Sequence, residues 1–315
     1  MRPLSWICGA MVVDMRVIER FCQGKRADQS LNEDGLIVTD AYAAVVDGVT
    51  SKSMRRLWRP SGGVVAKDLL LDAIAALPQD ASMREAQSML DSRLHERYER
   101  FECADCAHDD FDPCRVFAAE PWERLQANAV IYSDHRREAW LFGDCQIMVN
   151  GVQTPTVKRV DVLLGDLRSF AAQALALGGD TADTRDTADI GDTADSPAAS
   201  SAPAASSDPT RALIVPFLRL QTRFANQRGE YGYFVFDGFT DPDYPIRTIA
   251  VNPGDEVVLA SDGYPRLRPT LAASERELAR LREADPQLIH EYRSTKGFSP
   301  DLASFDDRTY LRFIA

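Results

Sequence analysis

Aspartate residues at the ends of short apolar segments are the side chains of this sequence with the clearest chemical potential. Asp47 follows the apolar run 43–46 and precedes Gly48, and Asp262 ends the run 257–260 in the same way, far later in the chain. Three further acids lie beside apolar runs of the same kind: Asp34, Asp144 and Asp306. A single Asp-Gly pair usually marks a turn. Five acids beside five predicted strands indicate instead that the strand ends share a site.

Carboxylates that meet at one site repel one another unless cations neutralise them. Oxygen ligands of this kind favour Mg²⁺ or Mn²⁺. The four histidines are scattered along the chain, and no two of them have the spacing of a zinc site. The acidic strand ends therefore predict a carboxylate-lined site for hard divalent cations.

The elements that position these acids follow from the apolar patterns of the chain. Strands and helices occur in separate blocks, which predicts an α+β fold with helices packed on antiparallel sheets. Ser61 is a predicted helix cap, and Ser274 with Glu277 forms a predicted capping box. Predicted helices span 63–77, 82–100, 161–177, 212–226 and 274–284. Predicted strands span 36–39, 43–46, 127–132, 139–142, 231–236, 246–251, 256–260 and 310–314, with the alternative of a first strand through 11–20.

The segment from about 178 to 210 differs in composition from the rest of the chain. It repeats Asp-Thr-Ala-Asp three times, then runs into Ala, Ser and Pro, and it contains one Ile and no aromatic residue. Such a segment buries too little apolar surface to offset the entropy lost on ordering, so we predict a disordered surface insertion. We expect a single domain over 1–315 that this insertion interrupts.

The overall composition excludes two classes of protein. Among 315 residues, 36 Lys and Arg face 48 Asp and Glu, a net charge of −12 with no basic stripe, which excludes binding to nucleic acid through phosphate neutralisation. No window of eighteen uninterrupted apolar residues exists, so no membrane span is expected. The mildly apolar start, residues 1–13, lacks a clear cleavage site, and we expect a cytoplasmic protein.

Six cysteines are too few and too unevenly spaced for a disulfide scaffold in a chain of this length. Cys103 and Cys106, followed by His108 and Cys114, have a spacing that zinc sites use. The same stretch contains four aspartates between two predicted elements. A solvated loop is therefore the favoured interpretation, and a zinc site is the alternative.

The order of the acidic motifs resembles that of a known family. Asn32-Glu33-Asp34-Gly35 is followed by Val-Val-Asp47-Gly48, Phe-Gly-Asp144, Leu-Ala-Ser-Asp262-Gly and Asp306-Asp-Arg-Thr. This order is similar to that of the metal-dependent protein phosphatases of type 2C, the PPM family, over nearly the whole chain apart from the insertion and the Cys-rich loop. The resemblance implies a four-layer α-β-β-α sandwich, in which two antiparallel sheets are flanked by helix pairs.

The resemblance also implies roles for individual residues. Asp47 would bridge two Mn²⁺ or Mg²⁺ ions, and the carbonyl of Gly48 would ligate one of them. Asp262 and Asp306 would hold the second ion, Asp34 would bind coordinated water beside the first, and Asp144 would lie near a third, weaker site. The implied reaction is in-line attack on phosphorus by a hydroxide that bridges two ions, so Asp47, Asp262 and Asp306 would act through metal-activated water.

Two positions depart from the family pattern. Gln29 stands where many members carry a phosphate-binding Arg, and Val49 stands where some carry a His. A guanidinium is well matched to phosphate, so the change at Gln29 is the more serious. We predict that Arg26 or Lys52 contacts phosphate instead, with Lys25, Arg55 and Arg56 as alternatives.

Three functions are compatible with the sequence. The first is hydrolysis of a phosphomonoester, with phosphoserine or phosphothreonine of a protein as the expected substrate. The second is a pseudophosphatase that acts as a binding or regulatory module, which the absence of an Arg at Gln29 would explain. The third is a phosphatase of a small phosphorylated metabolite. The sequence leaves the oligomeric state open.

Overall fold

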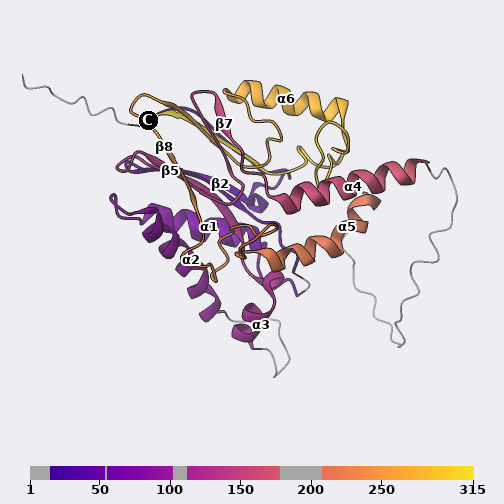
Figure 1. Ribbon diagram of the computed structural model, residues 1–315, viewed down its shortest axis with the longest axis horizontal. Helices are drawn as coiled ribbons and strands as arrows, with labels where there is room; N and C mark the ends of the chain where they lie inside the picture. Colours follow the sequence, from indigo (N-terminus) through magenta and orange to yellow (C-terminus); the bar gives the residue numbers. More distant parts are fainter. Residues whose placement is uncertain (1–14, 54, 102–111, 178–207) are drawn as a thin grey trace, which may run out of the picture.

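Two five-stranded antiparallel sheets form the centre of the computed structural model, which describes residues 15–53, 55–101, 112–177 and 208–315 (Figure 1). Sheet A has the order β1 (Arg16–Gln23), β10 (Arg308–Ile314), β9 (Glu256–Ala260), β6 (Gln146–Val149) and β7 (Val152–Thr154). Sheet B has the order β2 (Asp34–Val38), β3 (Tyr42–Gly48), β4 (Ala127–Ser133), β5 (Glu138–Phe142) and β8 (Arg247–Ala250). Every neighbouring pair within the two sheets is antiparallel.

Helices cover the outer faces of both sheets. Helix α1 (Gly62–Ala75) packs on β2 and β3 of sheet B, and α2 (Met83–Glu99) packs on α1. Helix α6 (Leu271–Ala284) covers sheet A, where Leu278 meets Val258 and Tyr310. The fold is thus an α+β sandwich of two antiparallel sheets between helices, as the sequence predicts. The short elements are α3 (Pro113–Ala119) and the 3-10 turns η1 (Gln29–Leu31), η2 (Pro121–Glu123) and η3 (Gln221–Phe224).

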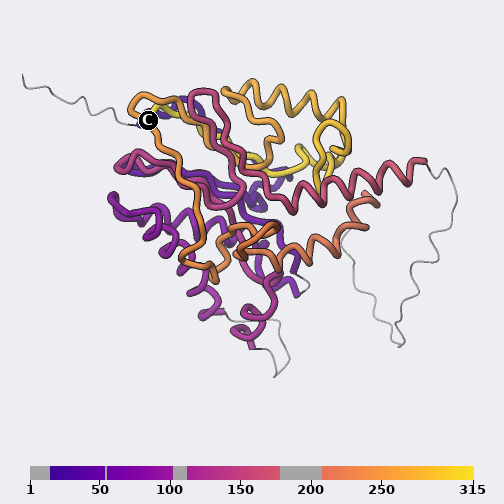
Figure 2. The backbone as a smooth tube through the Cα atoms, in the orientation of Figure 1, coloured from indigo at the N-terminus to yellow at the C-terminus, as the bar shows by residue number. Residues whose placement is uncertain are grey.

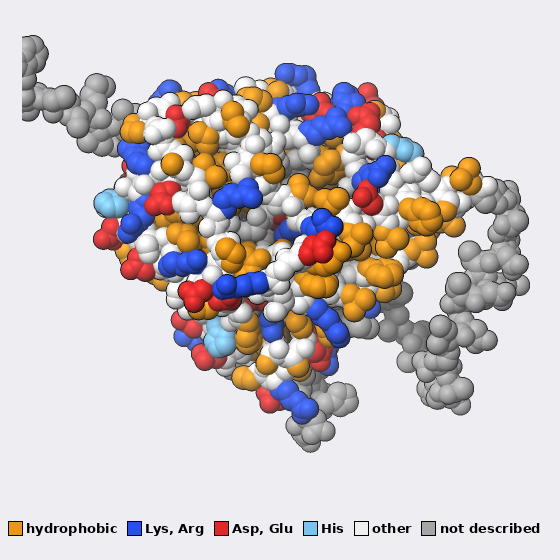
Figure 3. Space-filling view, viewed as in Figure 1, with side chains coloured by type: hydrophobic (Ala, Val, Ile, Leu, Met, Phe, Trp, Pro, Cys, Tyr) orange, Lys and Arg blue, Asp and Glu red, His pale blue; other side chains and the backbone are white. Residues whose placement is uncertain are grey.

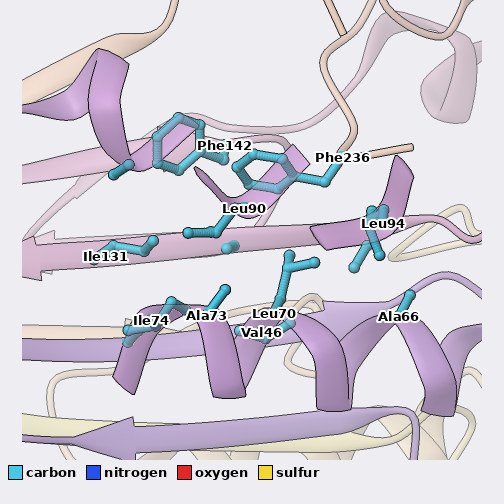
Figure 4. Close-up of a cluster of buried hydrophobic side chains, with 14 of the residues drawn as sticks. Val46, Ala66, Leu70, Ala73, Ile74, Leu90, Leu94, Ile131, Phe142 and Phe236 are labelled. Carbon is cyan, nitrogen blue, oxygen red and sulfur yellow. The ribbon is translucent and has the colours of Figure 1, made fainter. Parts of the chain in front are cut away.

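Two apolar cores fix the strand ends in place. Between the sheets, Val45 and Val130 of sheet B pack with Leu259 and Phe313 of sheet A. Side chains alternate along a strand, so the opposite face of sheet B is free to pack against helices. There Val46 of β3 meets a second core formed with α1 and α2, shown in Figure 4: Ala66, Leu70, Ala73, Ile74, Leu90, Leu94, Ile131, Phe142 and Phe236.

Helices α4 (Arg159–Leu177) and α5 (Pro209–Leu220) pack on each other and extend away from the sheets, forming what we call the α4–α5 arm (Figures 1 and 2). Leu164, Ile214 and Leu218 form its small internal core. Other large apolar side chains of the arm are exposed, including Phe170 at 70% and Phe217 at 48%. Figure 3 shows apolar side chains gathered over this part of the surface.

Most element boundaries agree with the sequence patterns, and the exceptions have local causes. The predicted strand 231–236 is wrong, because among these residues only Tyr233 and Phe236 pair, through isolated bridges. The predicted capping box is also wrong: α6 begins at Leu271 and is capped by Thr270, while the Ser274 hydroxyl accepts from the Arg268 amide. Helix α5 begins three residues before the predicted start, at Pro209 behind the Asp208 cap, and ends at Leu220 with a 3-10 turn.

Some predictions concern residues outside the described part of the chain. The insertion, except for its last few residues, and both Cys103 and Cys106 lie there, so the zinc alternative stays untested. Within the described residues, Cys114 is exposed and Cys145 is buried. None of the described helices combines the length and the apolar character that crossing a membrane requires.

Candidate metal centre

The predicted acids come together where strand ends of the two sheets meet. Asp34 begins β2 and Asp47 lies near the end of β3, directly opposite it in the antiparallel register. Asp262 follows β9, and Asp306 precedes β10, the neighbouring strand of sheet A. Four of the five predicted acids line one cleft of about 650 Å³, and the fifth, Asp34, is buried beside them: the four are Asp47, Asp144, Asp262 and Asp306.

Glycines beside the acids allow the close packing of these strand ends. A Cβ atom on Gly48 would lie 2.1 Å from the carbonyl oxygen of Gly63, at the start of α1. Gly143, which precedes Asp144, has a φ of 103°, and a Cβ atom there would lie 2.1 Å from Oδ1 of Asn128. Both positions therefore require glycine, and the Asp-Gly and Gly-Asp motifs have a steric basis as well as a chemical one.

The acids raise one another's pKa. Burial raises the pKa of Asp34 well above its usual range, and the nearby charges of Asp306 and Asp262 raise it further. Burial and the charge of Asp262 act on the pKa of Asp47 in the same direction. Asp262 touches solvent in the cleft but has protein on most sides, which raises its pKa to about 7, with further contributions from Asp306 and Asp144. Too little positive charge lies near Asp34, Asp47 and Asp262 for these carboxyls to ionise at their usual pH.

Lysines neutralise the other two acids. The Nζ of Lys25 lies 3.0 Å from Asp306, and Lys296 forms an ion pair with the same carboxylate. Burial opposes the ionisation of Asp306, but the two ammonium groups outweigh it and lower its pKa below the usual range. Lys158 lies 2.8 Å from Asp144. No sequence pattern indicates these pairs, because the partners are far apart in sequence or lie on different elements.

Two neighbouring acids have a structural role instead. The carboxylate of Glu33 accepts hydrogen bonds from the hydroxyls of Thr50, at 2.6 Å, and Ser61, at 2.8 Å. Asp307 accepts from the backbone N–H of Lys25 at 2.7 Å and from that of Glu33 at 3.2 Å. Both acids hold the segment before β2 against the site. In the Asp306-Asp307 motif, Asp306 therefore belongs to the site and Asp307 supports the neighbouring backbone.

The carboxylates of the site have the chemistry that a divalent cation requires, although they are not close enough together to coordinate one as they lie. Asp34 Oδ2 and Asp144 Oδ1 are buried without a hydrogen-bond partner. Unpartnered carboxylate oxygens with raised pKa values are relieved by a hard cation. As the side chains lie, no three acids, cysteines or histidines of the described residues are close enough to hold an ion. Joint ligation of an ion by several of these acids would therefore require their side chains to move, and Asp306 would have to leave Lys25 and Lys296.

The predicted phosphate contacts separate into two groups. Lys52 lines the cleft, and its Nζ donates to the carbonyl of Thr50 at 2.6 Å. Arg26 is exposed and is not among the residues lining the cleft. Gln29 holds the local backbone: its Nε2 donates to the carbonyl of Arg26 at 2.6 Å, and its Oε1 accepts from the N–H of Gly24 at 2.8 Å.

Residues that sequence reasoning passed over complete the cleft. Arg211 at the start of α5 and Asp161 of α4 line it, together with Lys296, which the sequence indicated only as a loop lysine. Asp161 accepts from Nε2 of Gln221 at 2.9 Å. Arg211 follows the insertion directly, and no local pattern ties it to strands on the other side of that segment.

Comparison with known proteins gives matches in structure alone. No protein-family model matches the chain, and no curated protein matches it in sequence. The photosystem II phosphatase PBCP matches with a TM-score of 0.47 at 11% identity, covering 96% of this chain and 98% of that one. The catalytic domain of the serine/threonine phosphatase PstP, in complex with two manganese ions, matches with a TM-score of 0.44 at 14% identity, covering 95% and 98%.

A further match is the PPM Ser-Thr phosphatase MsPP from Mycobacterium smegmatis, in complex with cacodylate. Its TM-score is 0.39 at 13% identity, and the match covers 95% of this chain and 99% of that one. At these identities and scores the likeness is distant. The chemistry of the site therefore has to be judged from its own side chains.

Proposed function

We propose that this protein is a phosphatase that hydrolyses phosphomonoesters with the help of two bound Mn²⁺ or Mg²⁺ ions. The observation that carries the proposal is the convergence of five aspartates from distant parts of the chain: four line one cleft that also contains basic side chains, and Asp34 is buried beside them. Asp34, Asp47 and Asp262 repel one another in the metal-free chain, and a divalent cation removes that repulsion.

Each side chain has a defined part in this proposal. Asp34, Asp47, Asp262 and Asp306, with the Gly48 carbonyl, would hold the two ions, and Asp144 would lie near a third. The ions, when bound, supply Lewis acidity and lower the pKa of water. Lys25 holds Asp306 in position, and Lys158 holds Asp144. Lys52 would contact the phosphoryl oxygens, in the place of the Arg that Gln29 replaces.

We propose a phosphoserine or phosphothreonine side chain of a cytoplasmic protein as the substrate. A cleft of about 650 Å³ also has room for a small phosphorylated metabolite. Assays with phosphopeptides and with small phosphate esters under the same conditions would separate the two. A kcat/KM at least about tenfold higher for one class would identify the substrate.

A second function is favoured by the lysine pairs. Lys25 and Lys296 both pair with Asp306, and Lys158 pairs with Asp144, so part of the acidic charge is neutralised without any ion. A pseudophosphatase that binds a phosphorylated partner without hydrolysing it would have this property. Calorimetric titration with Mn²⁺ distinguishes the functions, because a pseudophosphatase of this kind would take up no ion.

The decisive assay is turnover of p-nitrophenyl phosphate with added Mn²⁺, with EDTA as the blank. We expect metal-dependent turnover that Asp262→Asn abolishes and Asp40→Asn, an exposed acid at the β2–β3 turn, leaves unchanged. Absence of turnover with Mn²⁺ and with Mg²⁺, in protein shown to be folded, would refute the proposed hydrolysis.

A further inference from the structure

Among the described residues, five lysines and arginines line the cleft that holds the acids, and two of them are engaged elsewhere: Lys158 pairs with Asp144, and Arg293 pairs with Asp166 at the surface. The other three come from separate segments. Lys52 follows β3, Arg211 lies in the first turn of α5, and Lys296 lies in the loop between α6 and β10. We call these three residues the basic wall. None of them lies near Gln29, which precedes the first acidic motif.

Two members of the basic wall have no acidic partner. The ammonium of Lys52 donates to the carbonyl of Thr50, and the guanidinium of Arg211 donates to the carbonyl of Thr295 at 2.6 Å. Neither forms an ion pair with any carboxylate of the described residues. A guanidinium carries five N–H donors, so Arg211 keeps donors free after this hydrogen bond. Cations of this kind inside a cleft are unusual unless an anion binds them.

The three cations are close enough to repel one another. Burial, together with the charges of Arg211 and Lys296, lowers the pKa of Lys52 to about 7. Burial also lowers the pKa of Arg211. An anion placed among these groups would replace repulsion by attraction, and it would provide the acceptors that the cations lack.

The loop that carries Lys296 is held firmly against the arm. The carboxylate of Asp285 accepts from the backbone N–H groups of Ile289, His290 and Glu291, at 2.8 to 3.1 Å. Arg168, buried in α4, donates to the carbonyls of Gln287 at 2.7 Å and Ser294 at 3.1 Å. The backbone that carries Lys296 is therefore in place before any ligand arrives, which lowers the entropy cost of binding.

We propose that Lys52, Arg211 and Lys296 form a binding site for a tetrahedral oxyanion, the phosphoryl group of the substrate. These residues would take the place of the arginine that is absent at position 29. This assignment extends the proposed function, because it names the phosphoryl-binding residues of the same cleft. Lys296, paired with Asp306, joins the anion site to the acidic centre. The site binds phosphate without metal, so it can be tested apart from catalysis.

The test is titration of the full chain with inorganic phosphate in EDTA at pH 6.5, followed by calorimetry. Hydrogen bonds between charged groups contribute about 1.5–3 kcal/mol, so Lys52→Met and Arg211→Met should each weaken phosphate binding about 10- to 100-fold. The matched control is Arg223→Gln, an exposed basic residue of η3 at the base of the same arm, which should change binding less than about twofold. With Mn²⁺ present, both Met variants should raise KM for p-nitrophenyl phosphate more than they lower kcat.

The outcomes separate this proposal from the phosphatase itself. If phosphate binding depends on Lys52 and Arg211 but the protein shows no turnover, the anion site is supported and the proposed hydrolysis is refuted. Turnover with unchanged phosphate affinity in both Met variants would refute the anion site and retain the phosphatase. If Arg211→Met fails to fold because its hydrogen bond to Thr295 is removed, then Lys52→Met decides, since the Lys52 ammonium donates only to a carbonyl two residues away.

Discussion

Replacement of Asp47 by Asn should stabilise the metal-free protein while it abolishes metal-dependent turnover. Asp47 lies directly opposite Asp34 across β2 and β3, and Asp262 adds a third carboxyl. The substitution keeps the shape of the side chain and removes its charge. Stability and function should therefore respond in opposite directions to the same change.

The size of the gain follows from the register. Directly opposed residues of an antiparallel pair have Cβ atoms about 5 Å apart. Two unit charges at about that distance repel by about 3 kcal/mol at an effective dielectric constant of about 20. The nearby lysines offset part of this, so we expect a gain of about 2 kcal/mol. For a chain of this length that corresponds to a rise in Tm of about 4 °C.

The gain should depend on pH with a defined sign. The folded-state pKa values of Asp34, Asp47 and Asp262 are raised, to about 7 for Asp262, whereas an unfolded Asp titrates near pH 4. Between these values the folded state binds more protons than the unfolded state, so the stability of the wild type falls as pH rises from about 4 to about 7. The advantage of Asp47→Asn should thus be small at pH 4 and grow as pH rises.

Differential scanning calorimetry in EDTA from pH 4 to 8 measures this directly. Asp40→Asn, at the exposed turn of the same strand pair, is the matched control and should leave Tm unchanged at every pH. Added Mn²⁺ should raise the Tm of the wild type and leave that of Asp47→Asn nearly unchanged, because only the wild type binds the ions. A Tm of Asp47→Asn equal to or below that of the wild type at pH 8 would show that the acids do not strain the fold.

Three further outcomes are expected. Gly48→Ala should lower the free energy of unfolding by more than about 2 kcal/mol in urea, since its Cβ would meet the carbonyl of Gly63, whereas Gly62→Ala, with no atom nearer than 3.5 Å, should change it by less than about 1 kcal/mol. Asp285→Ala should lower the free energy of unfolding by about 3 kcal/mol and also weaken phosphate binding in EDTA, because the substitution releases the backbone that positions Lys296. Unchanged phosphate binding in this variant would contradict the role of Asp285. Sulfate keeps its charge across neutral pH, so its affinity in EDTA should fall by up to about tenfold per pH unit above pH 7, because Lys52 loses its proton. Asp262 titrates in the same range. The contribution of Lys52 is therefore measured as the decrease in this pH dependence in Lys52→Met.

The sequence predicts where the acids lie, because each acid is close in sequence to the strand that positions it; their role as metal ligands stays a prediction. An apolar run such as 43–46 identifies the strand, and Asp47 at its end is then placed by the register. The basic wall lacks such a signal. Lys52 follows a strand end, but Arg211 lies on a helix beyond a long insertion, and only the tertiary packing brings it to the cleft.

Local patterns also mislead where a tertiary contact outweighs them. Ser274 and Glu277 have the spacing of a capping box, yet the Ser274 hydroxyl accepts from the Arg268 amide and Glu277 pairs with Arg266 and Arg280. The apolar segment 231–236 contains the residues of a strand, but its backbone pairs at two residues only. Phe234 and Phe236 pack into the core beside α2, whereas Tyr231 and Tyr233 pack in a separate small cluster.

Most of the hydrogen bonds that join the α4–α5 arm to the loop 287–295 end on backbone acceptors of the loop, apart from one surface ion pair between Arg293 and Asp166. Arg168 and Arg211 donate to carbonyl groups, which every residue type provides. The loop can therefore exchange its side chains at Gln287, Ser294 and Thr295 without loosening the join, whereas Arg168 has no substitute of equal reach and geometry. We therefore expect related chains to vary at these three loop positions and to retain arginine at position 168.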